Sequence, residues 1–519
     1  MGLYLNPRND SFQQALNNPI YVDKSLLIKY TNQLIGTGDN KLCVSRPRRF
    51  GKSTDANMLV AYYSKGCDSH HIFDSLKISQ TDHYLEHLNL HHVIHINMQS
   101  FLSNTHNIDK MIQLLTTRIL NELKQEYSVT FFDETNLSLS LEDIYVSTKD
   151  QFIFIIDEWD CIFREYAQNQ EDQKQYLDFL INLLKDKPYV ELAYMTGILP
   201  IKKYGTHSAL NMFEEISMID PGLLSEFMGF TETEVQNLCI QYNVSYDEMK
   251  QWYDGYHMTD HLSTLSPRSV VSSLIRKQFG NYWTSTETYE ALQVYIDLNK
   301  DGLKDSVIEM LAGESVPVQT SSFQNDMTTF DTKDDVLTLL IHLGYLGYNS
   351  SDHTCYIPNK EVIDSFVNSI RKSNWEETTK ALLSSRELLE ATWRKDEEAV
   401  ARYIEEAHLN TSILTYNNEN ALAYTLLLAY ISARDYYTMI REMPTGKGFA
   451  DIVLIPYRDK PAMIIELKWN KDVKTAIDQI NEKKYPKGLE KYKDNLLIVR
   501  ISYDKKTKKH TCHIEKNTN

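Results

Sequence analysis

The sequence predicts an α/β protein with two chemically distinct parts, because polar motifs accompany apolar strand-like runs near both ends of the chain. In the N-terminal part, the apolar segment 42–44 precedes a Gly-Lys-Ser-Thr turn, and the apolar segment 152–156 ends in two acids. Near the C-terminus, segments 448–454 and 463–468 carry an Asp, a Glu and a Lys among apolar residues. Buried apolar strands that alternate with helices are typical of a mostly parallel sheet, which we expect in the N-terminal part. A smaller α/β domain is expected at the C-terminal end.

The Gly-Lys-Ser-Thr turn is typical of a P-loop, which requires Gly-x-x-x-x-Gly-Lys-Ser/Thr between a strand and a helix. The second Gly, the Lys and the Ser are present, but Arg46 occupies the position of the first Gly. Backbone N–H groups at a helix N-terminus, the lysine and Mg²⁺ on the serine would still hold phosphates. The sequence therefore predicts binding of ATP and Mg²⁺ at Arg49, Gly51, Lys52, Ser53 and Thr54, with Ser53 as a metal ligand.

The arginines of the loop leave two alternatives open. Arg46, Arg48 and Arg49 can contact the phosphates of a nucleotide or a nucleic acid, or they can pair with acids of the protein core. If Arg46, in place of the first glycine, prevents the loop from binding phosphate, the P-loop fold would persist without a working nucleotide site.

The apolar segment 152–156 predicts a central parallel strand, since such strands are buried on both faces. Asp157 at its end is expected to hold the same Mg²⁺ as Ser53, and Glu158 is expected to activate a water molecule. Segment 192–195 predicts another core strand, and Thr196 at its polar end is a candidate sensor of the γ-phosphate.

The C-terminal motifs predict a β-hairpin that carries a metal site. A hairpin symmetric about Arg458 and Asp459 places Asp451 opposite Glu466, with Cβ atoms about 5 Å apart. Two carboxylates at that distance repel each other unless a cation neutralises them, and Mg²⁺ suits oxygen ligands. Lys468 shares a face with Glu466 and could position a water molecule or stabilise a phosphate. A solvated strand face without metal is the alternative.

This hairpin resembles the core of the PD-(D/E)xK nuclease superfamily, in which an Asp on one strand is followed by Glu-x-Lys on the next. The resemblance implies a restriction-endonuclease-like domain, with the Asp, Glu and Lys above as catalytic residues and both acids as metal ligands. In the family a Glu on the preceding helix often completes the metal site, and Glu419 matches it. Gln479 and Tyr485 look like the Gln and Tyr of the family's following helix.

Three N-terminal segments, 21–25, 45–53 and 155–160, together resemble the AAA-ATPase-like family. The Arg-Pro-Arg-Arg form of the loop is typical of that family, and its members commonly carry a C-terminal PD-(D/E)xK domain. Shorter matches extend the resemblance over nearly the whole chain, at 196–199, 228–235, 252–256 and 266–269. The resemblance implies a P-loop NTPase core joined to a nuclease-like domain, and it leaves the biological role open.

Breaks in the pattern divide the chain into four expected parts. These are a P-loop core at 1–215, a helical lid at 216–300, a mostly helical connector at 301–410 and the nuclease-like domain at 411–519. Within them, residues 107–127 have the spacing of an amphipathic helix, and Thr231 is placed to cap the N-terminus of another helix.

Composition limits the classes of partner. A net charge of −17 over 519 residues argues against a general basic surface that coats nucleic acid. After residue 470 Lys and Arg outnumber Asp and Glu, which gives the hairpin a basic flank or simply a solvated terminal segment. The sequence contains no apolar run of membrane-spanning length, and its six cysteines form no CxxC pair. We therefore expect a cytoplasmic protein with free thiols and no membrane partner.

The first functional hypothesis is an ATP-binding, Mg²⁺-dependent nuclease that acts on nucleic acid, with DNA favoured over RNA. The second is a nucleotide-dependent switch whose nuclease-like domain only binds nucleic acid or protein. A third is an NTPase that moves DNA without cleaving it. Whether the chain forms a homo-oligomer stays open.

Overall fold

The computed structural model describes most of the chain as two compact units. The described residues are 2–201, 203–204, 207–208, 210–286, 289–325, 327–372, 376–410, 425–445, 448–457, 460–469, 489, 492, 494–504, 507 and 509–516. One unit comprises Met1–Glu287 with Pro317–Val362, and the other comprises Thr288–Val316 with Ile363–Asn519. The four-part division expected from the sequence stays a prediction.

The first unit is built on a five-stranded parallel sheet with the strand order β2-β3-β4-β1-β7. Its strands are β1 (Lys41–Ser45), β2 (His92–Asn97), β3 (Phe152–Asp157), β4 (Val190–Gly197) and β7 (Glu214–Ile216). Every residue of β3 is buried, which confirms the predicted central strand. Because the strands are parallel, their carboxyl ends meet at one edge of the sheet, where ligands of such folds commonly bind.

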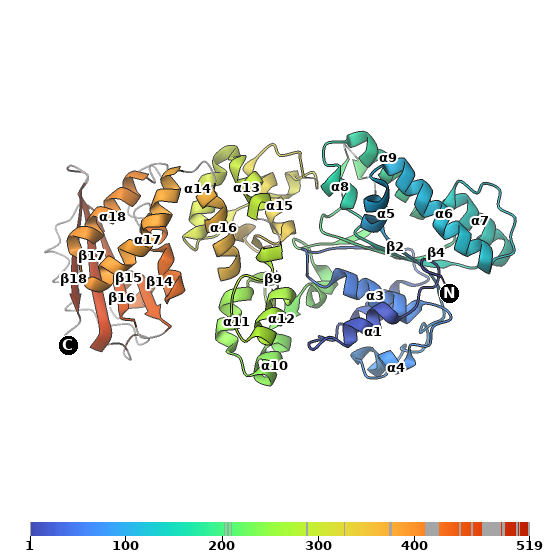
Figure 1. Ribbon diagram of the computed structural model, residues 1–519, viewed down its shortest axis with the longest axis horizontal. Coiled ribbons are helices and arrows are strands. Elements are labelled where there is room, and N and C mark those ends of the chain that lie inside the picture. The colour runs from blue at the N-terminus through green and yellow to red at the C-terminus, as the bar shows by residue number, and fades with distance from the viewer. Residues whose placement is uncertain are drawn as a thin grey trace. The chain divides into compact units, whose positions relative to one another are not determined.

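Helices cover both faces of this sheet (Figure 1). One face carries α5 (Met98–Thr105), α6 (Ile108–Glu126), α7 (Leu137–Thr148), α8 (Cys161–Glu165) and α9 (Gln170–Leu184). The other carries α1 (Asp10–Leu16), α3 (Lys52–Tyr63) and α4 (His70–Phe73). Helix α6 confirms the amphipathic helix expected at residues 107–127, and its apolar side, including Met111, Leu115 and Ile119, is buried.

A small helical subdomain with a three-stranded sheet follows the parallel sheet within the first unit. It contains η2 (Gly222–Phe227), β8 (Phe230–Thr231), α10 (Glu232–Tyr242), α11 (Tyr246–Tyr253), β9 (Tyr256–Thr259), β10 (Leu262–Leu265) and α12 (Pro267–Arg276). Thr231 caps α10 through a reciprocal capping box with Glu234, as the sequence predicts. Val235, Met249 and Val270 form part of the apolar core that joins its helices.

A buried carboxylate ties this subdomain to the P-loop. Glu361 accepts hydrogen bonds from the backbone N–H groups of Tyr282 and Trp283 and from the Ser269 hydroxyl. The indole N–H of Trp283 in turn donates to the carbonyl oxygen of Arg48, at 2.8 Å. The loop is thus held by contacts that come from far along the chain.

The second unit contains a five-stranded mixed sheet in the order β14-β15-β16-β17-β18. Only β16 and β17 pair in parallel; the other neighbours are antiparallel. The strands are β14 (Tyr437–Thr445), β15 (Gly448–Pro456), β16 (Ala462–Trp469), β17 (Leu496–Asp504) and β18 (Lys509–Lys516). Helices α17 (Glu376–Arg394) and α18 (Glu397–Asn410) pack together, and α18 lies against β18 (Figure 1).

The remaining elements do not belong to the two five-stranded sheets. They are α2 (Leu26–Leu34), η1 (Lys77–Gln80), β5 (Lys203–Tyr204), β6 (His207–Ser208), η3 (Thr284–Thr286), α13 (Tyr289–Asp297), η4 (Lys300–Gly302), α14 (Leu303–Leu311), β11 (Val316–Pro317), η5 (Thr320–Ser322), α15 (Lys333–Leu343), β12 (Gly347–Asn349), β13 (Thr354–Tyr356), α16 (Lys360–Lys372) and η6 (Ile431–Asp435). No helix among the described residues is both long and apolar enough to cross a membrane.

Candidate functional site

The P-loop connects β1 to α3 at the carboxyl edge of the parallel sheet. Gly51 has φ +95°, a left-handed conformation that favours glycine, and Lys52 begins α3. The Lys52 ammonium donates to the loop carbonyl oxygens of Arg46 and Pro47, each at 3.0 Å. Burial lowers the pKa of Lys52 to about 8. The loop therefore holds its lysine with its own backbone oxygens, at the edge where a phosphate would bind.

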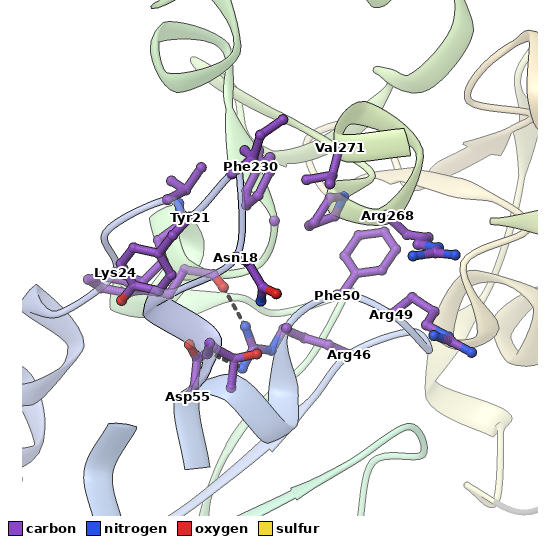
Figure 2. A pocket seen from close by; sticks show the side chains of 18 of the residues that line it. Asn18, Tyr21, Lys24, Arg46, Arg49, Phe50, Asp55, Phe230, Arg268 and Val271 are labelled. Carbon is purple, nitrogen blue, oxygen red and sulfur yellow. Dashed lines mark hydrogen bonds and ion pairs between the residues drawn. The ribbon is translucent and has the colours of Figure 1, made fainter. Parts of the chain in front are cut away.

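Arg46, which replaces the first glycine, is a buried packing residue. The residue is 1% exposed, and its side chain donates at 2.5 Å to both Asp55 of α3 and the carbonyl oxygen of Phe227. Figure 2 shows its guanidinium beside Asp55. Of the two alternatives left open for this arginine, the structure shows pairing with an acid of the core. The arginine at the position of the first glycine thus links the P-loop to α3 and to η2.

Ser53 and Asp157, the two predicted Mg²⁺ ligands, lie together. The Ser53 hydroxyl donates to Asp157 Oδ2 at 2.7 Å, and Asp157 Oδ1 accepts from the Glu158 N–H at 3.0 Å. Asp157 ends β3 and is almost fully buried. A hydroxyl and a carboxylate in contact form an oxygen set that fits a hard divalent cation.

Glu158, the predicted base, is held by an arginine that the sequence analysis did not single out. Its backbone is left-handed, with φ +55°, and its carboxylate pairs with Arg164 of α8. Burial raises the pKa of Glu158, although the positive charges of Arg164 and Lys52 oppose that shift. The spacing of six residues between Glu158 and Arg164 matches no helix or strand period that would predict their contact. The turn between them determines the direction of the Arg164 side chain.

Thr196 lies at the end of β4 and is fully buried. Its hydroxyl donates to the carbonyl oxygen of Val44 at 3.0 Å, across the β1–β4 pair. Its role as a γ-phosphate sensor stays a prediction.

Two cavities meet at the P-loop. The larger, about 780 Å³, is lined by Arg48, Lys52, Ser53, Glu158 and Arg164 among others. The smaller, about 390 Å³, lies between the loop, residues 15–24 and the helical subdomain, and includes Tyr21, Phe50, Phe230 and Arg268 (Figure 2). Arg49, Gly51 and Thr54 line both cavities. The P-loop thus borders both the larger cavity, which is the more polar, and the smaller cavity, which is the more apolar.

The C-terminal hairpin has the predicted register. Ile452 pairs with Ile465, and Leu454 with Met463, as expected for a turn symmetric about residues 458 and 459. Glu466 lies in β16 and is 5% exposed. The side chains of Asp451 in β15 and Lys468 in β16 lie outside the described part of the structure, as do residues Glu419, Gln479 and Tyr485 entirely.

Arg500 in β17 is a further charged residue at this hairpin. It pairs in parallel register with Glu466, so both side chains point to the same face of the sheet. Arg500 is almost fully buried, and its Nη2 donates to Glu515 at 2.6 Å. An arginine inside the apolar run 496–501 is the signal by which the sequence could have revealed it.

Among the side chains that the structure describes, no group of three or more His, Cys, Asp and Glu is arranged to hold a metal ion. The side chain of Asp451, the expected partner of Glu466, lies outside that set, and the metal site at the hairpin stays a prediction.

Comparison with known proteins identifies both parts. The family described as "Predicted AAA-ATPase" matches residues 10–206, and the PD-(D/E)XK nuclease superfamily matches residues 417–512. No curated protein matches the sequence. Among solved structures, the Walker-type ATPase PABY2304 of Pyrococcus abyssi is 12% identical with a TM-score of 0.35, over 67% of this chain and 97% of that one.

The ORC2 protein of Aeropyrum pernix, solved as ADPNP–ADP complexes, is 12% identical with a TM-score of 0.24, over 68% of this chain and 96% of that one. With two family matches in the order that the motifs predict, the chain is an AAA-ATPase-like protein that carries a C-terminal domain of the PD-(D/E)XK nuclease superfamily.

Proposed function

We propose that this protein binds and hydrolyses ATP in its first unit and cleaves nucleic acid in its C-terminal domain, under the control of the nucleotide. The observation that carries the nucleotide half is the contact of Ser53 with Asp157 beside Lys52, at the carboxyl edge of the parallel sheet. These are the residue types that hold Mg²⁺ and the β- and γ-phosphates in P-loop proteins.

The triphosphate would occupy the larger cavity, where Lys52, Arg49 and the N-terminus of α3 offer positive charge and N–H donors. The nucleoside would occupy the smaller cavity, against the rings of Tyr21 and Phe50. Mg²⁺, when held by Ser53 and Asp157, would neutralise phosphate charge. Glu158 would then accept a proton from the attacking water as the bond between the γ-phosphorus and its bridging oxygen breaks.

The nuclease half rests on the hairpin. The observed register, continued by one pair, brings Asp451 opposite Glu466, and Lys468 lies two residues further along the same strand. In the superfamily such acids hold Mg²⁺, and we assign Asp451 and Glu466 to it, with Glu419 as a further ligand. Gln479 and Tyr485 are assigned to the helix that supports the site, and DNA is the proposed substrate.

Nucleotide control requires that ATP favour one arrangement of the two units over another, because a ligand shifts an equilibrium only through its differential affinity for the states. A switch that binds nucleic acid without cleaving it would use the same coupling. The two functions differ only in the chemistry at the hairpin.

The experiment measures cleavage of supercoiled plasmid, linear DNA and single-stranded RNA with Mg²⁺, with and without ATP, by the wild type and Lys468→Ala. The proposal expects DNA cleavage that ATP changes and that the variant loses. Lys380→Ala, which removes an exposed lysine from α17 of the same unit, is the matched control and should cleave normally. Absence of cleavage by folded, metal-loaded wild type would favour the binding switch.

A further inference from the structure

Arg164 bridges two acids at the edge of the larger cavity. Its Nη2 pairs with Glu158, and its Nε lies 3.2 Å from Asp160 Oδ2. The side chain of Arg164 is 11% exposed and that of Glu158 is 23% exposed, so both reach the cavity surface while remaining mostly buried. Both residues line that cavity.

The two acids differ in how firmly they are held. Asp160 is fully buried, and its Oδ2 also accepts from the backbone N–H groups of Ile198 and Leu199 at 3.1 and 2.9 Å. Glu158 lines the cavity and its side chain is 23% exposed, so it is the more accessible of the two partners. Arg164 therefore has one fixed anchor at Asp160 and one exchangeable partner at Glu158.

A γ-phosphate entering the larger cavity would be a second anionic partner for the same guanidinium. Phosphate oxygens and carboxylates bind arginine in the same bidentate geometry, so they compete for its N–H donors. ADP brings no γ-phosphate and would leave the pair with Glu158 intact.

Building on the nucleotide site proposed above, we propose that Arg164 is an ATP-specific latch. It holds Glu158 away from the reaction in the absence of a γ-phosphate, and it exchanges Glu158 for the γ-phosphate when ATP binds. Arg164 is thus a positioning residue for Glu158, and it determines the preference for binding ATP over ADP.

The test is the affinity for ADP and for the non-hydrolysable analogue ADPNP, measured by titration calorimetry with Mg²⁺. Arg164→Gln should weaken ADPNP binding about tenfold or more, the scale of one charge-assisted hydrogen bond, and leave ADP binding nearly unchanged. Arg164→Lys should restore part of the preference for ADPNP. Equal loss for both nucleotides would overturn the latch and make Arg164 a structural residue.

Glu158→Gln tests the same contact from the side of the acid, in a protein that retains the guanidinium of Arg164. It should tighten ADPNP binding, and it should lose this effect when combined with Arg164→Gln. Glu165→Gln removes a neighbouring carboxylate that lines the same cavity but bonds to Gln99, and it should leave the ADPNP:ADP ratio unchanged. Additive effects in the double variant, or a similar gain in Glu165→Gln, would overturn the exchange.

Failure of the nucleotide site itself has a separate signature. The proposed function and the latch would both be wrong if wild type bound neither nucleotide. They would also both be wrong if Lys52→Ala bound ADP and ADPNP with the same affinities as wild type. If Lys52→Ala weakened binding while Arg164→Gln left the ADPNP:ADP ratio unchanged, only the latch would fall.

Discussion

The hydroxyl of Ser53 donates to the carboxylate of Asp157 at 2.7 Å, although 104 positions separate them in the chain. They meet because Ser53 follows β1 and Asp157 ends β3, and both strands pair in parallel with β4. Parallel pairing brings the carboxyl ends of the strands to one edge, so the two halves of the proposed cation site come together only in the folded sheet.

Lys52→Ala should weaken the binding of ATP and ADP. The variant removes a buried ammonium that would exchange its two loop carbonyls for phosphate oxygens. The expected loss is roughly tenfold to a hundredfold, as for a hydrogen bond to a charged group. Titration calorimetry measures it, and Lys110→Ala, an exposed lysine of α6, is the control. Unchanged affinity in Lys52→Ala would move the nucleotide away from the P-loop.

Glu158→Gln should bind ATP but hydrolyse it about 10²-fold more slowly or worse, because the amide cannot accept the proton of the attacking water. Phosphate release from ATP measures the rate. Glu165→Gln, which neutralises the neighbouring cavity acid, should retain hydrolysis. Wild-type turnover by Glu158→Gln would assign the base to another residue.

Asp55→Ala should destabilise the first unit by about 3–5 kcal/mol, because it leaves the buried guanidinium of Arg46 without its carboxylate. Denaturant unfolding, followed by the transition of the first unit, measures the change. Asp10→Ala breaks the exposed pair with Arg8 and should cost about 1 kcal/mol or less. Similar small effects of both variants would show that the Arg46 contact does not secure the loop.

Acid should destabilise the second unit through a buried histidine pair. His408 Nδ1 and His510 Nε2 are 2.7 Å apart, and the Tyr503 ring packs against both. Burial, reinforced for His408 by its neighbour, lowers the pKa of His408 to about 3 and that of His510 to about 4. The unfolded chain protonates both near its usual pKa of about 6.5, so between these values it binds more protons than the folded chain.

The free energy of unfolding should therefore rise with pH from about 4 to about 6.5 and fall as the solution is acidified through that window. His510→Gln removes one titrating group and should flatten the pH dependence, whereas His261→Gln, an exposed histidine, should not. The midpoint of denaturant unfolding at a series of pH values measures the slope. An unchanged slope in His510→Gln would contradict the assignment.

Much of the fold follows from local sequence patterns. The apolar run before Asp157, the spacing of α6 and the capping pair of Thr231 with Glu234 each involve neighbours in the chain. The hairpin register follows from its short turn, and the pairing of Ile452 with Ile465 confirms it. Such features depend on periodicity and turn length, which a single sequence displays.

The partners of the charged side chains depended on the folded chain. From the sequence, Arg46 could contact either a phosphate or an acid of the protein core. The structure shows that it is buried and paired with Asp55. The sequence offered no sign that Arg164 would hold Glu158, and the arginine inside the apolar run 496–501 did not by itself show that Arg500 would lie beside Glu466.

The sequence by itself thus determined the two families of domain, the central strand and the hairpin register, and it supplied the residues proposed to bind nucleotide and metal. Only the tertiary structure decided which of these residues touch, as with Ser53 and Asp157, and which charges serve packing, as with Arg46. The physical reason is that strands and caps form between neighbours in the chain. The partner of a buried charge comes from wherever the fold brings an oppositely charged group within hydrogen-bonding distance.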